Sequence, residues 1–297
     1  MAAVPRAPRR RRQQRQLERG AGPLGAGPRR HGRRGGDLHL RLPHLGGVRP
    51  RAGALVLALL AGSASLVPPA GGAAPTAYEP RRPAVVERLV LGHSVRGRPI
   101  TAWRLGQPGE RRVLLVSTMH GNEPHTRQIL TSLRDGAPIR GVDLWVIPDY
   151  NPDGLRQRTR RNARGVDLNR NYPYRWADLD GTYESGRAPA SEPETRAVMR
   201  FLRDVRPRRL ISFHQPLVGV DTDTKDRHFA RRLARALRLP RTTLDCGGIC
   251  HGTMTGWFNA RFRGAAVTVE YGAHPSRHRM AVEAPRQLLR LLGARRS

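Results

Sequence analysis

Four short apolar runs along the chain each end in a cluster of polar residues. The runs cover residues 113–116, 142–148, 210–213 and 266–269. Their length and their content of branched residues are typical of buried strands. The polar residues that follow them are His120, Glu123, Asn151, Asp153, His214 and Glu270. Because ligands bind outside the carboxyl ends of the strands in an open α/β sheet, we expect a functional site where these residues meet.

Helical periodicity occupies several of the intervals between these runs. It predicts helices near residues 126–133, 191–205, 226–237 and 284–292. Ser191 and Glu194 have the spacing of a capping box at the start of the second helix, and Pro193 fits its first turn. The glycines within residues 92–97 predict a turn between two strands. With no internal repeat and no linker, residues 78–297 are interpreted as one α/β domain.

The first 74 residues show a different pattern. Residues 1–47 are rich in Arg, Gly and Pro and have no hydrophobic period, so we interpret them as disordered or untranslated. Residues 48–74 carry two arginines, an apolar stretch over 52–67 and then small residues, as a secretory signal peptide does. That stretch is too short for a stable membrane span. Our hypothesis is that translation starts near Val48 and that the protein is secreted or held in a bacterial cell envelope.

The charge of the chain is strongly positive, at +31, with 54 Lys and Arg against 23 Asp and Glu. Only Lys225 is a lysine, and this skew, with many Ala, Gly and Pro, is typical of a GC-rich coding sequence. A basic arm at residues 1–47 would have no aromatic residue to stack on bases. We therefore expect no nucleic-acid partner, although anionic polymers will attract the protein. We also expect a monomer.

The two cysteines, Cys246 and Cys250, both follow the signal-peptide pattern. In an oxidising compartment they are expected to pair. The alternative is a second metal site that also uses His251. Three ligands within six residues lack the usual spread of a structural zinc site, so the disulfide is favoured.

The His-x-x-Glu pair at His120 and Glu123 suggests a metal site. Two residues three apart in one helical turn can point the same way, and zinc accepts both an imidazole and a carboxylate. A catalytic zinc needs a third protein ligand and an open position for water, and His214 is the candidate. An isolated His-x-x-Glu is common by chance, so the prediction depends on the other strand-end residues.

The loop over residues 151–173 is dense in arginine and asparagine. Arginine binds a carboxylate through two parallel hydrogen bonds, and an Asn amide adds another donor. A solvated basic loop would account for most single arginines here. It would not explain the tight sequence Asp-Leu-Asn-Arg-Asn at residues 167–171, which favours an anion site.

Six motifs, in this order, make residues 85–290 resemble the zinc carboxypeptidases of the carboxypeptidase A type. The motifs are His-Gly-Asn-Glu-Pro from residue 120, Asn-Pro-Asp-Gly from 151, Gly-Val-Asp-Leu-Asn-Arg-Asn from 165, Ser-Glu-Pro-Glu from 191, Phe-His-Gln from 213 and Val-Thr-Val-Glu-Tyr from 267. Within that family the chain is most similar to the bacterial murein peptide amidases. The resemblance implies a mixed, mostly parallel eight-stranded sheet flanked by helices.

The resemblance also implies roles for single residues. The expected ligands of one Zn²⁺ per chain are His120, Glu123 and His214. Asn169 and Arg170 are expected to bind the free carboxylate of the substrate, and Glu270 to act as general base. Arg160 is expected to polarise the scissile carbonyl, with Arg158 and Arg161 as open alternatives.

One departure from the family concerns a mobile tyrosine that many members carry between the third ligand and the catalytic Glu. No tyrosine lies between His214 and Glu270 here. We expect residues 247–257 to form the wall of the specificity pocket instead. Thr255 is predicted as its floor and His251 as a substitute donor, with Thr253, Asp221 and Asp223 as further polar groups.

The leading functional hypothesis is an exported zinc amidase or carboxypeptidase that cuts a C-terminal amide in a peptide. Its expected substrate is a murein peptide, cut at the γ-D-glutamyl–diaminopimelate bond. Three alternatives remain: a deacylase of N-acyl amino acids of the aspartoacylase or succinylglutamate desuccinylase type, a general metallocarboxypeptidase, and an inactive wall-binding homologue. The deacylases would not explain export or the Asn-Pro-Asp-Gly sequence. The intact set of candidate catalytic residues disfavours the inactive homologue.

Overall fold

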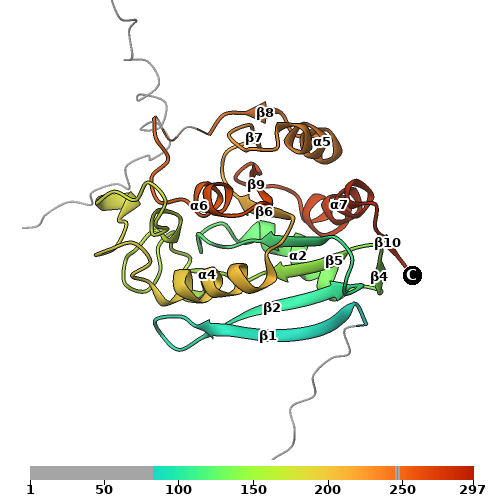
Figure 1. Cartoon of the computed structure of the whole chain (residues 1–297), viewed down its shortest axis with the longest axis horizontal. Helices are drawn as coiled ribbons and strands as arrows, with labels where there is room; N and C mark the ends of the chain where they lie inside the picture. The colour runs from blue at the N-terminus through green and yellow to red at the C-terminus, as the bar shows by residue number, and fades with distance from the viewer. Residues whose placement is uncertain (1–82, 245, 247) are drawn as a thin grey trace, which may run out of the picture. The chain divides into compact units, whose positions relative to one another are not determined.

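The apolar runs of the sequence form the centre of one β-sheet. The computed structural model describes residues 83–297 except 245 and 247, and in this part eight strands hydrogen-bond in the order β1-β2-β5-β3-β6-β9-β7-β8 (Figure 1). These strands are β1 (Val85–His93), β2 (Pro99–Gly106), β3 (Arg112–Val116), β5 (Asp143–Ile147), β6 (Arg209–His214), β7 (Gly219–Asp221), β8 (Arg241–Thr242) and β9 (Ala265–Glu270). A separate two-stranded sheet pairs β4 (Ile139–Arg140) with β10 (Arg295–Arg296).

The middle of the large sheet is parallel and its flanks contain the antiparallel pairs. Strands β5, β3, β6 and β9 are parallel neighbours, so the four predicted runs all end at the same edge of the sheet. β2 pairs antiparallel with β5 and with β1, and β7 pairs antiparallel with β9 and parallel with β8. The predicted mixed, mostly parallel eight-stranded sheet is confirmed.

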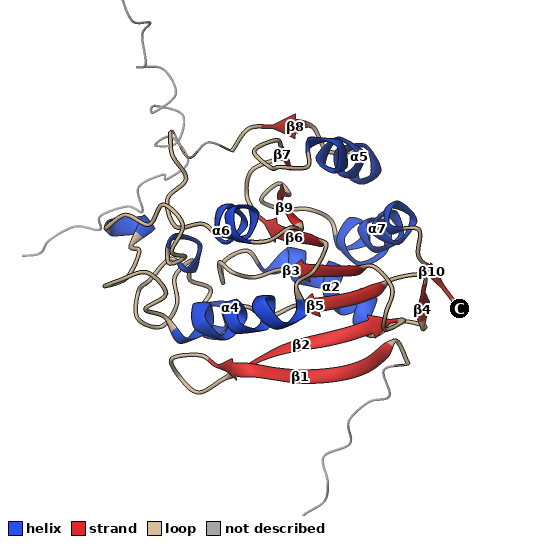
Figure 2. Ribbon diagram, in the orientation of Figure 1, coloured by secondary structure: helices blue, strands red, loops and turns tan. Residues whose placement is uncertain are grey.

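Helices cover both faces of the sheet, as Figure 2 shows. They are α2 (Arg127–Arg134), α3 (Pro152–Gln157), α4 (Pro193–Val205), α5 (Arg227–Leu237), α6 (Met254–Arg261) and α7 (Ala284–Leu292). Among the described residues, the remaining helical elements are three short 3₁₀-helices, η2 (Pro124–Thr126), η3 (Leu168–Arg170) and η4 (Gly181–Tyr183), and one π-helix, η5 (Arg279–Glu283).

The two faces of the sheet have separate hydrophobic cores. Val113 and Leu115 of β3 pack in one core with apolar residues of α2, α5 and α7. Leu114 and Val116 belong to the other, with residues of α4 and α6. The division follows the period of two in a strand, which sends successive side chains to opposite faces. It also explains why these runs are continuously apolar: both faces of the strand are buried.

The four predicted helices are present within one or two residues of their expected bounds, but the capping box is wrong. No side chain caps the start of α4. The buried Glu194 carboxylate instead accepts hydrogen bonds from the Val95 amide at 3.1 Å and from the Asn162 side chain at 3.2 Å. A buried carboxylate needs such partners, and here they are provided by the turn between β1 and β2 and by the loop after α3. At α5, Asp226 does cap the helix, through the Phe229 amide.

The hypotheses about residues 1–47 and the signal peptide at 48–74 lie outside the described residues. Within residues 83–297, apart from 245 and 247, no helix is long and apolar enough to cross a membrane.

Candidate active site

The predicted site residues meet at the carboxyl edge of the parallel strands. His214 is the last residue of β6 and Glu270 the last of β9, and the two are partners across the parallel pair. His120 and Glu123 follow β3, where the chain turns sharply at Thr118 in the left-handed conformation (φ 53°). The turn also passes very close to α3: a Cβ on Gly121 would lie 1.9 Å from the Gly154 carbonyl carbon. Only glycine therefore fits between His120 and Asn122.

Three candidate ligand atoms converge at this edge. The Nδ1 atom of His120 lies 2.7 Å from Glu123 Oε1, and the Nδ1 atom of His214 lies 3.1 Å from Glu123 Oε2. The two Nδ1 atoms are 3.2 Å apart. Ligands about 2.0–2.1 Å from a tetrahedral zinc lie roughly 3.3 Å from one another, so these separations fit such an ion. Three nitrogen and oxygen donors also leave a fourth position, as a catalytic site requires.

The second nitrogen of each imidazole has its own partner. His120 Nε2 lies 3.1 Å from Asp167 Oδ1, and His214 Nε2 lies 2.9 Å from Ser212 Oγ. Such partners fix the ring orientation and leave the other nitrogen for the metal. The sequence pattern alone predicted no role for Asp167 or Ser212. Ser212 lies two residues before His214 on β6, so the period of two could have identified it.

The electrostatics of the three ligands differ. Burial alone would lower the pKa of His120, but the Glu123 and Asp167 carboxylates outweigh it and raise this pKa to about 9. Burial lowers the pKa of His214, which is therefore neutral near pH 7. Burial opposes ionisation of Glu123, yet the two imidazoles hold its pKa at about 2. Without metal, the cluster is thus a His120 cation beside a Glu123 carboxylate.

Glu270 is held in a poorly solvated position beside this cluster. It is 9% exposed, and its Oε2 atom has no hydrogen-bond partner among the described residues. Burial, and then the Glu123 charge, raise the pKa of Glu270 to about 8. A divalent cation next to it would favour the ionised form. Glu270 thus has a buried oxygen free to bind a water beside His120, Glu123 and His214.

Of the three candidate arginines, the structure brings Arg160 to the cluster. Its Nε and Nη2 atoms donate to Asp167 Oδ2 at 2.9 and 2.8 Å, and its Nη1 atom lies 3.7 Å from Glu123 Oε1. Arg158 is the exposed left-handed residue that ends α3, and Arg161 donates to the Gly181 carbonyl. Asp167 thus binds both His120 and Arg160, which makes it the central acceptor of the site.

The predicted carboxylate clamp is continuous with this network. Arg170 is 8% exposed, donates to the Asn169 carbonyl at 2.8 Å, and has its pKa lowered by burial. The Asn169 side-chain oxygen accepts a hydrogen bond from the Met254 amide at 3.1 Å, so the NH₂ group of Asn169 points away from that amide. The clamp and the start of α6 are therefore held together.

The residues at 246 and 248–257 have different roles. Cys246 and Cys250 form the expected disulfide, which leaves no thiolates for a second metal site. The Thr255 hydroxyl lies 3.3 Å from that of Thr268 on β9. Thr253 caps α6 through the Gly256 amide, so its hydroxyl is used within the chain. His251 binds the Arg175 carbonyl at 2.7 Å.

Asp221 is also used within the chain. Its Oδ1 atom accepts from the amides of Asp223 and Leu244. Burial raises its pKa to about 6. Asp221 therefore braces the loop before the disulfide.

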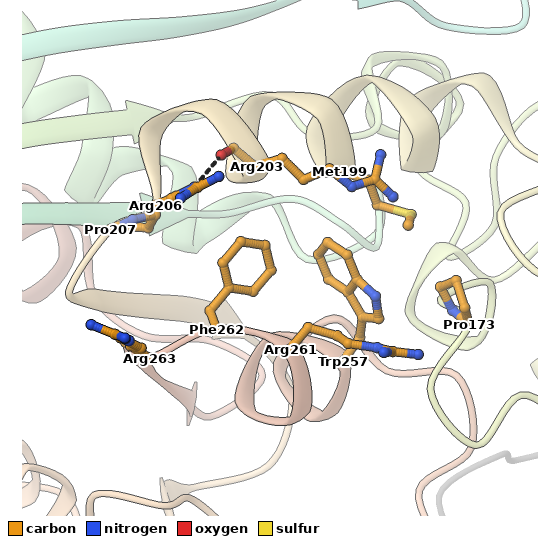
Figure 3. A pocket seen from close by; sticks show the side chains of 10 residues that line it. Pro173, Met199, Arg203, Arg206, Pro207, Trp257, Arg261, Phe262 and Arg263 are labelled. Carbon is orange, nitrogen blue, oxygen red and sulfur yellow. Dashed lines mark hydrogen bonds between the residues drawn. The ribbon is translucent and has the colours of Figure 1, made fainter.

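A cavity of about 490 Å³ opens over Arg170. Its lining includes Asp178, Asp180, Tyr183, Ile249 and His251. A larger cavity of about 950 Å³ lies between α4 and α6, with Trp257, Phe262 and several arginines around it (Figure 3). The larger cavity contains no metal-binding or nucleophilic side chain, so its residues cannot perform the chemistry available at the cluster.

Comparison with known proteins agrees with this geometry. A family model described as zinc carboxypeptidase matches residues 76–217, which include His120, Glu123, Arg170 and His214. Glu270 lies beyond that match, and the structure alone places it beside His214.

Individual relatives and one solved structure also match this chain. Murein peptide amidase A of Escherichia coli strain K12 is 32% identical over 167 residues, which are 51% of this chain and 68% of the relative. The enzyme of that name from Vibrio campbellii is 30% identical over 193 residues, or 60% and 77% of the two chains. The crystal structure of murein-tripeptide amidase from Escherichia coli O157 aligns with a TM-score of 0.57 and 28% identity, over 69% of this chain and 91% of that one. This chain therefore belongs to the zinc carboxypeptidase family and is a hydrolase of the metallocarboxypeptidase and amidase type.

Proposed function

We propose that this protein is a zinc-dependent amidase of murein peptides that hydrolyses the γ-D-glutamyl–diaminopimelate bond outside the cytoplasm. The observation that carries the proposal is the convergence of His120, Glu123 and His214, with ligand atoms 2.7–3.2 Å apart, beside the buried Glu270. Zinc held there would lower the pKa of a bound water and polarise an amide carbonyl.

The remaining steps belong to the side chains of this chain. Glu270 takes a proton from the water through its free Oε2 atom and returns it to the leaving amine. Arg160, fixed by Asp167, directs its Nη1 atom toward the cluster and stabilises the oxygen that becomes negative. Asn169 and Arg170 bind the carboxylate next to the cleaved amide, which sets the position of the bond.

Two features support a murein peptide as the substrate. Two relatives of about 30% identity carry the name murein peptide amidase A. The cavity over Arg170 also has charged and polar side chains in its mixed lining, among them Asp178, Asp180 and His251. Diaminopimelate has an amine and a second carboxylate at its far end, and these side chains together with Arg170 offer partners for both. An apolar C-terminal side chain would leave those polar groups unpaired.

Export is supported by the signal-peptide pattern at residues 48–74 and by the Cys246–Cys250 disulfide, since disulfides persist in oxidising compartments. We expect secreted protein to begin between Gly71 and Tyr78, which N-terminal sequencing would measure. Recovery of an exported product that begins at Met1 would refute this part of the proposal.

The decisive experiment compares two substrates side by side. Zinc-loaded protein is given L-alanyl-γ-D-glutamyl-diaminopimelate and a peptide that ends in phenylalanine, and products are identified by mass spectrometry. We expect a far higher kcat/KM for the first, and turnover of either substrate lowered by about 10²–10⁴-fold in a Glu270→Gln control. Equal or better cleavage of the phenylalanine peptide would reassign the chain as a general carboxypeptidase. Hydrolysis of N-acyl amino acids alone would favour the deacylase alternative.

A further inference from the structure

Tyr183 covers both arginines of the candidate site with one aromatic ring. The ring centre lies 5.5 Å from Arg160 Cζ and 4.9 Å from Arg170 Cζ. A guanidinium within about 6 Å of a ring centre is attracted by the ring face. Arg160 is proposed to polarise the carbonyl and Arg170 to hold the carboxylate, so Tyr183 links the two anion-binding groups.

The backbone around Tyr183 is tied to the same network. Tyr183 ends the short helix η4, and the carbonyl of the next residue, Glu184, accepts the Asp167 amide at 2.7 Å. The Gly181 carbonyl accepts from Arg161 at 2.8 Å. The backbone of Asp167 therefore holds the loop that carries Tyr183. The side chain of Asp167 holds His120 and Arg160. The position of the ring is set by the site that it covers.

The face of the Tyr183 ring can stabilise the positive charges of two neighbouring guanidinium groups without accepting hydrogen bonds from them. Burial, and then the Arg160 charge, lower the pKa of Arg170, whereas the Asp167 carboxylate opposes that shift. The Asp167 carboxylate is already bound to Arg160 and His120 through its side chain. A π face stabilises the cations without accepting their in-plane N–H bonds, so it occupies no donor beyond those already bound to Asp167, the Asn169 carbonyl and Cys246 Sγ.

The Tyr183 side chain is also accessible. It is 45% exposed, and its hydroxyl makes no hydrogen bond within residues 83–297, apart from 245 and 247. It lines the 490 Å³ cavity together with Arg170. A large exposed aromatic ring without a packing role in the cores is therefore placed at the entrance to the carboxylate site.

We propose that Tyr183 is a positioning residue for the substrate carboxylate: its ring holds Arg160 and Arg170 side by side at the cavity where the substrate would bind. This inference rests on the proposed function, since it requires Arg170 to bind a carboxylate. It also assigns an aromatic cover to a chain that has no tyrosine between His214 and Glu270. The cover comes from the loop before α4 instead.

The test measures two ligands on the zinc-loaded protein by titration calorimetry. Diaminopimelate bears the carboxylate, whereas acetohydroxamate binds a metal and has no carboxylate. In Tyr183→Ala we expect the Kd of diaminopimelate to rise about tenfold, which is about 1.4 kcal/mol, with the Kd of acetohydroxamate unchanged within about twofold. Tyr183→Phe keeps the ring, so it should bind both ligands like the wild type. Arg170→Ala should weaken diaminopimelate more than Tyr183→Ala does.

Each of the other possible results would refute a specific part of the proposal. Wild-type binding by Tyr183→Ala, while Arg170→Ala fails, would refute the role of Tyr183 and leave the proposed function intact. Equal weakening in Tyr183→Phe and Tyr183→Ala would refute the role of the ring. Parallel loss of both ligands in Tyr183→Ala would show a general collapse of the site. If Arg170→Ala binds diaminopimelate normally, the carboxylate assignment in the proposed function fails, and this inference fails with it.

Discussion

Two arginine-lined cavities of this molecule, called hollows below, differ in how the guanidinium groups of their arginines are held. At the candidate active site, Arg160 is bound by Asp167, Arg170 is bound by the Asn169 carbonyl, and Tyr183 covers both. The groove between α4 and α6 carries four exposed arginines around an aromatic floor (Figure 3). They are Arg203, Arg206, Arg261 and Arg263. None of these four has an ion-pair partner within the described part of the chain.

The difference shows how little arginine content says about function in this protein. With 54 Lys and Arg against 23 Asp and Glu, most cations must remain unpaired, and clusters such as the groove are expected. At the active site, Arg160 is distinguished by its ion pairs with Asp167 and Glu123 and Arg170 by its burial. Arg206 of the groove, in contrast, is exposed and donates to the Arg203 carbonyl. We therefore expect changes at the two hollows to have effects of very different size.

The largest effect is expected for Glu270→Gln. The amide cannot accept the water proton, and general base catalysis contributes about 10²–10⁴-fold, so turnover should fall by that factor. Zinc content and thermal midpoint should stay near the wild type, because Glu270 is not one of the converging ligand atoms. Steady-state kinetics and metal analysis measure both. Near-normal turnover would mean that another group acts as the base.

The second effect compares the two hollows directly. Arg170→Ala should lower kcat/KM by about 30-fold to 5,000-fold, since loss of one partner of a buried charge pair costs about 2–5 kcal/mol. Replacement of all four groove arginines by glutamine should change kcat/KM by less than about twofold, because solvent and salt screen exposed charges. A groove variant as impaired as Arg170→Ala would show that the groove binds substrate.

The strand-end residues could be predicted from the sequence because β-structure is regular. His214 and Glu270 follow directly after apolar runs, and neighbouring parallel strands place such residues at the same edge of the sheet. Loops have no period, so the sequence could not decide which of Arg158, Arg160 and Arg161 faces the cluster. Nor could the sequence show that the Tyr183 ring lies against the two arginines of the site. The capping box failed for another reason: burial gave the Glu194 carboxylate stronger partners than its own helix end.

The third effect concerns metal binding and pH. Zinc must displace the proton of His120, whose pKa is raised to about 9, whereas His214 and Glu123 need no deprotonation near pH 7. One proton released per zinc gives about a tenfold gain in apparent affinity for each pH unit between 7 and 9, with a plateau above. Competition with a chelator measures this slope. The four-arginine groove variant should give the same curve.

A matched change at Asp167 tests the cause of that slope. Asp167→Asn removes one of the two carboxylates that raise the pKa of His120, so the plateau should begin at lower pH. Loss of the partner of a metal-binding histidine should also weaken zinc by about 10–100-fold. An unchanged plateau in this variant would show that Asp167 does not control the protonation of His120.

The smallest effect is expected in the stability of the groove variant. Four like charges around one cavity, without carboxylate partners in the described residues, repel one another in the folded state. Their replacement by glutamine should therefore stabilise the protein, by up to about 1 kcal/mol at low ionic strength. The gain should shrink as salt is added, because the Debye length falls to about 10 Å at 0.1 M. Urea unfolding of zinc-loaded protein at low and high salt would measure it. Arg160→Gln should have the opposite sign, since it breaks the pair with the buried Asp167 carboxylate. Destabilisation of the groove variant at low salt would contradict the comparison, because it would mean that those arginines have stabilising partners.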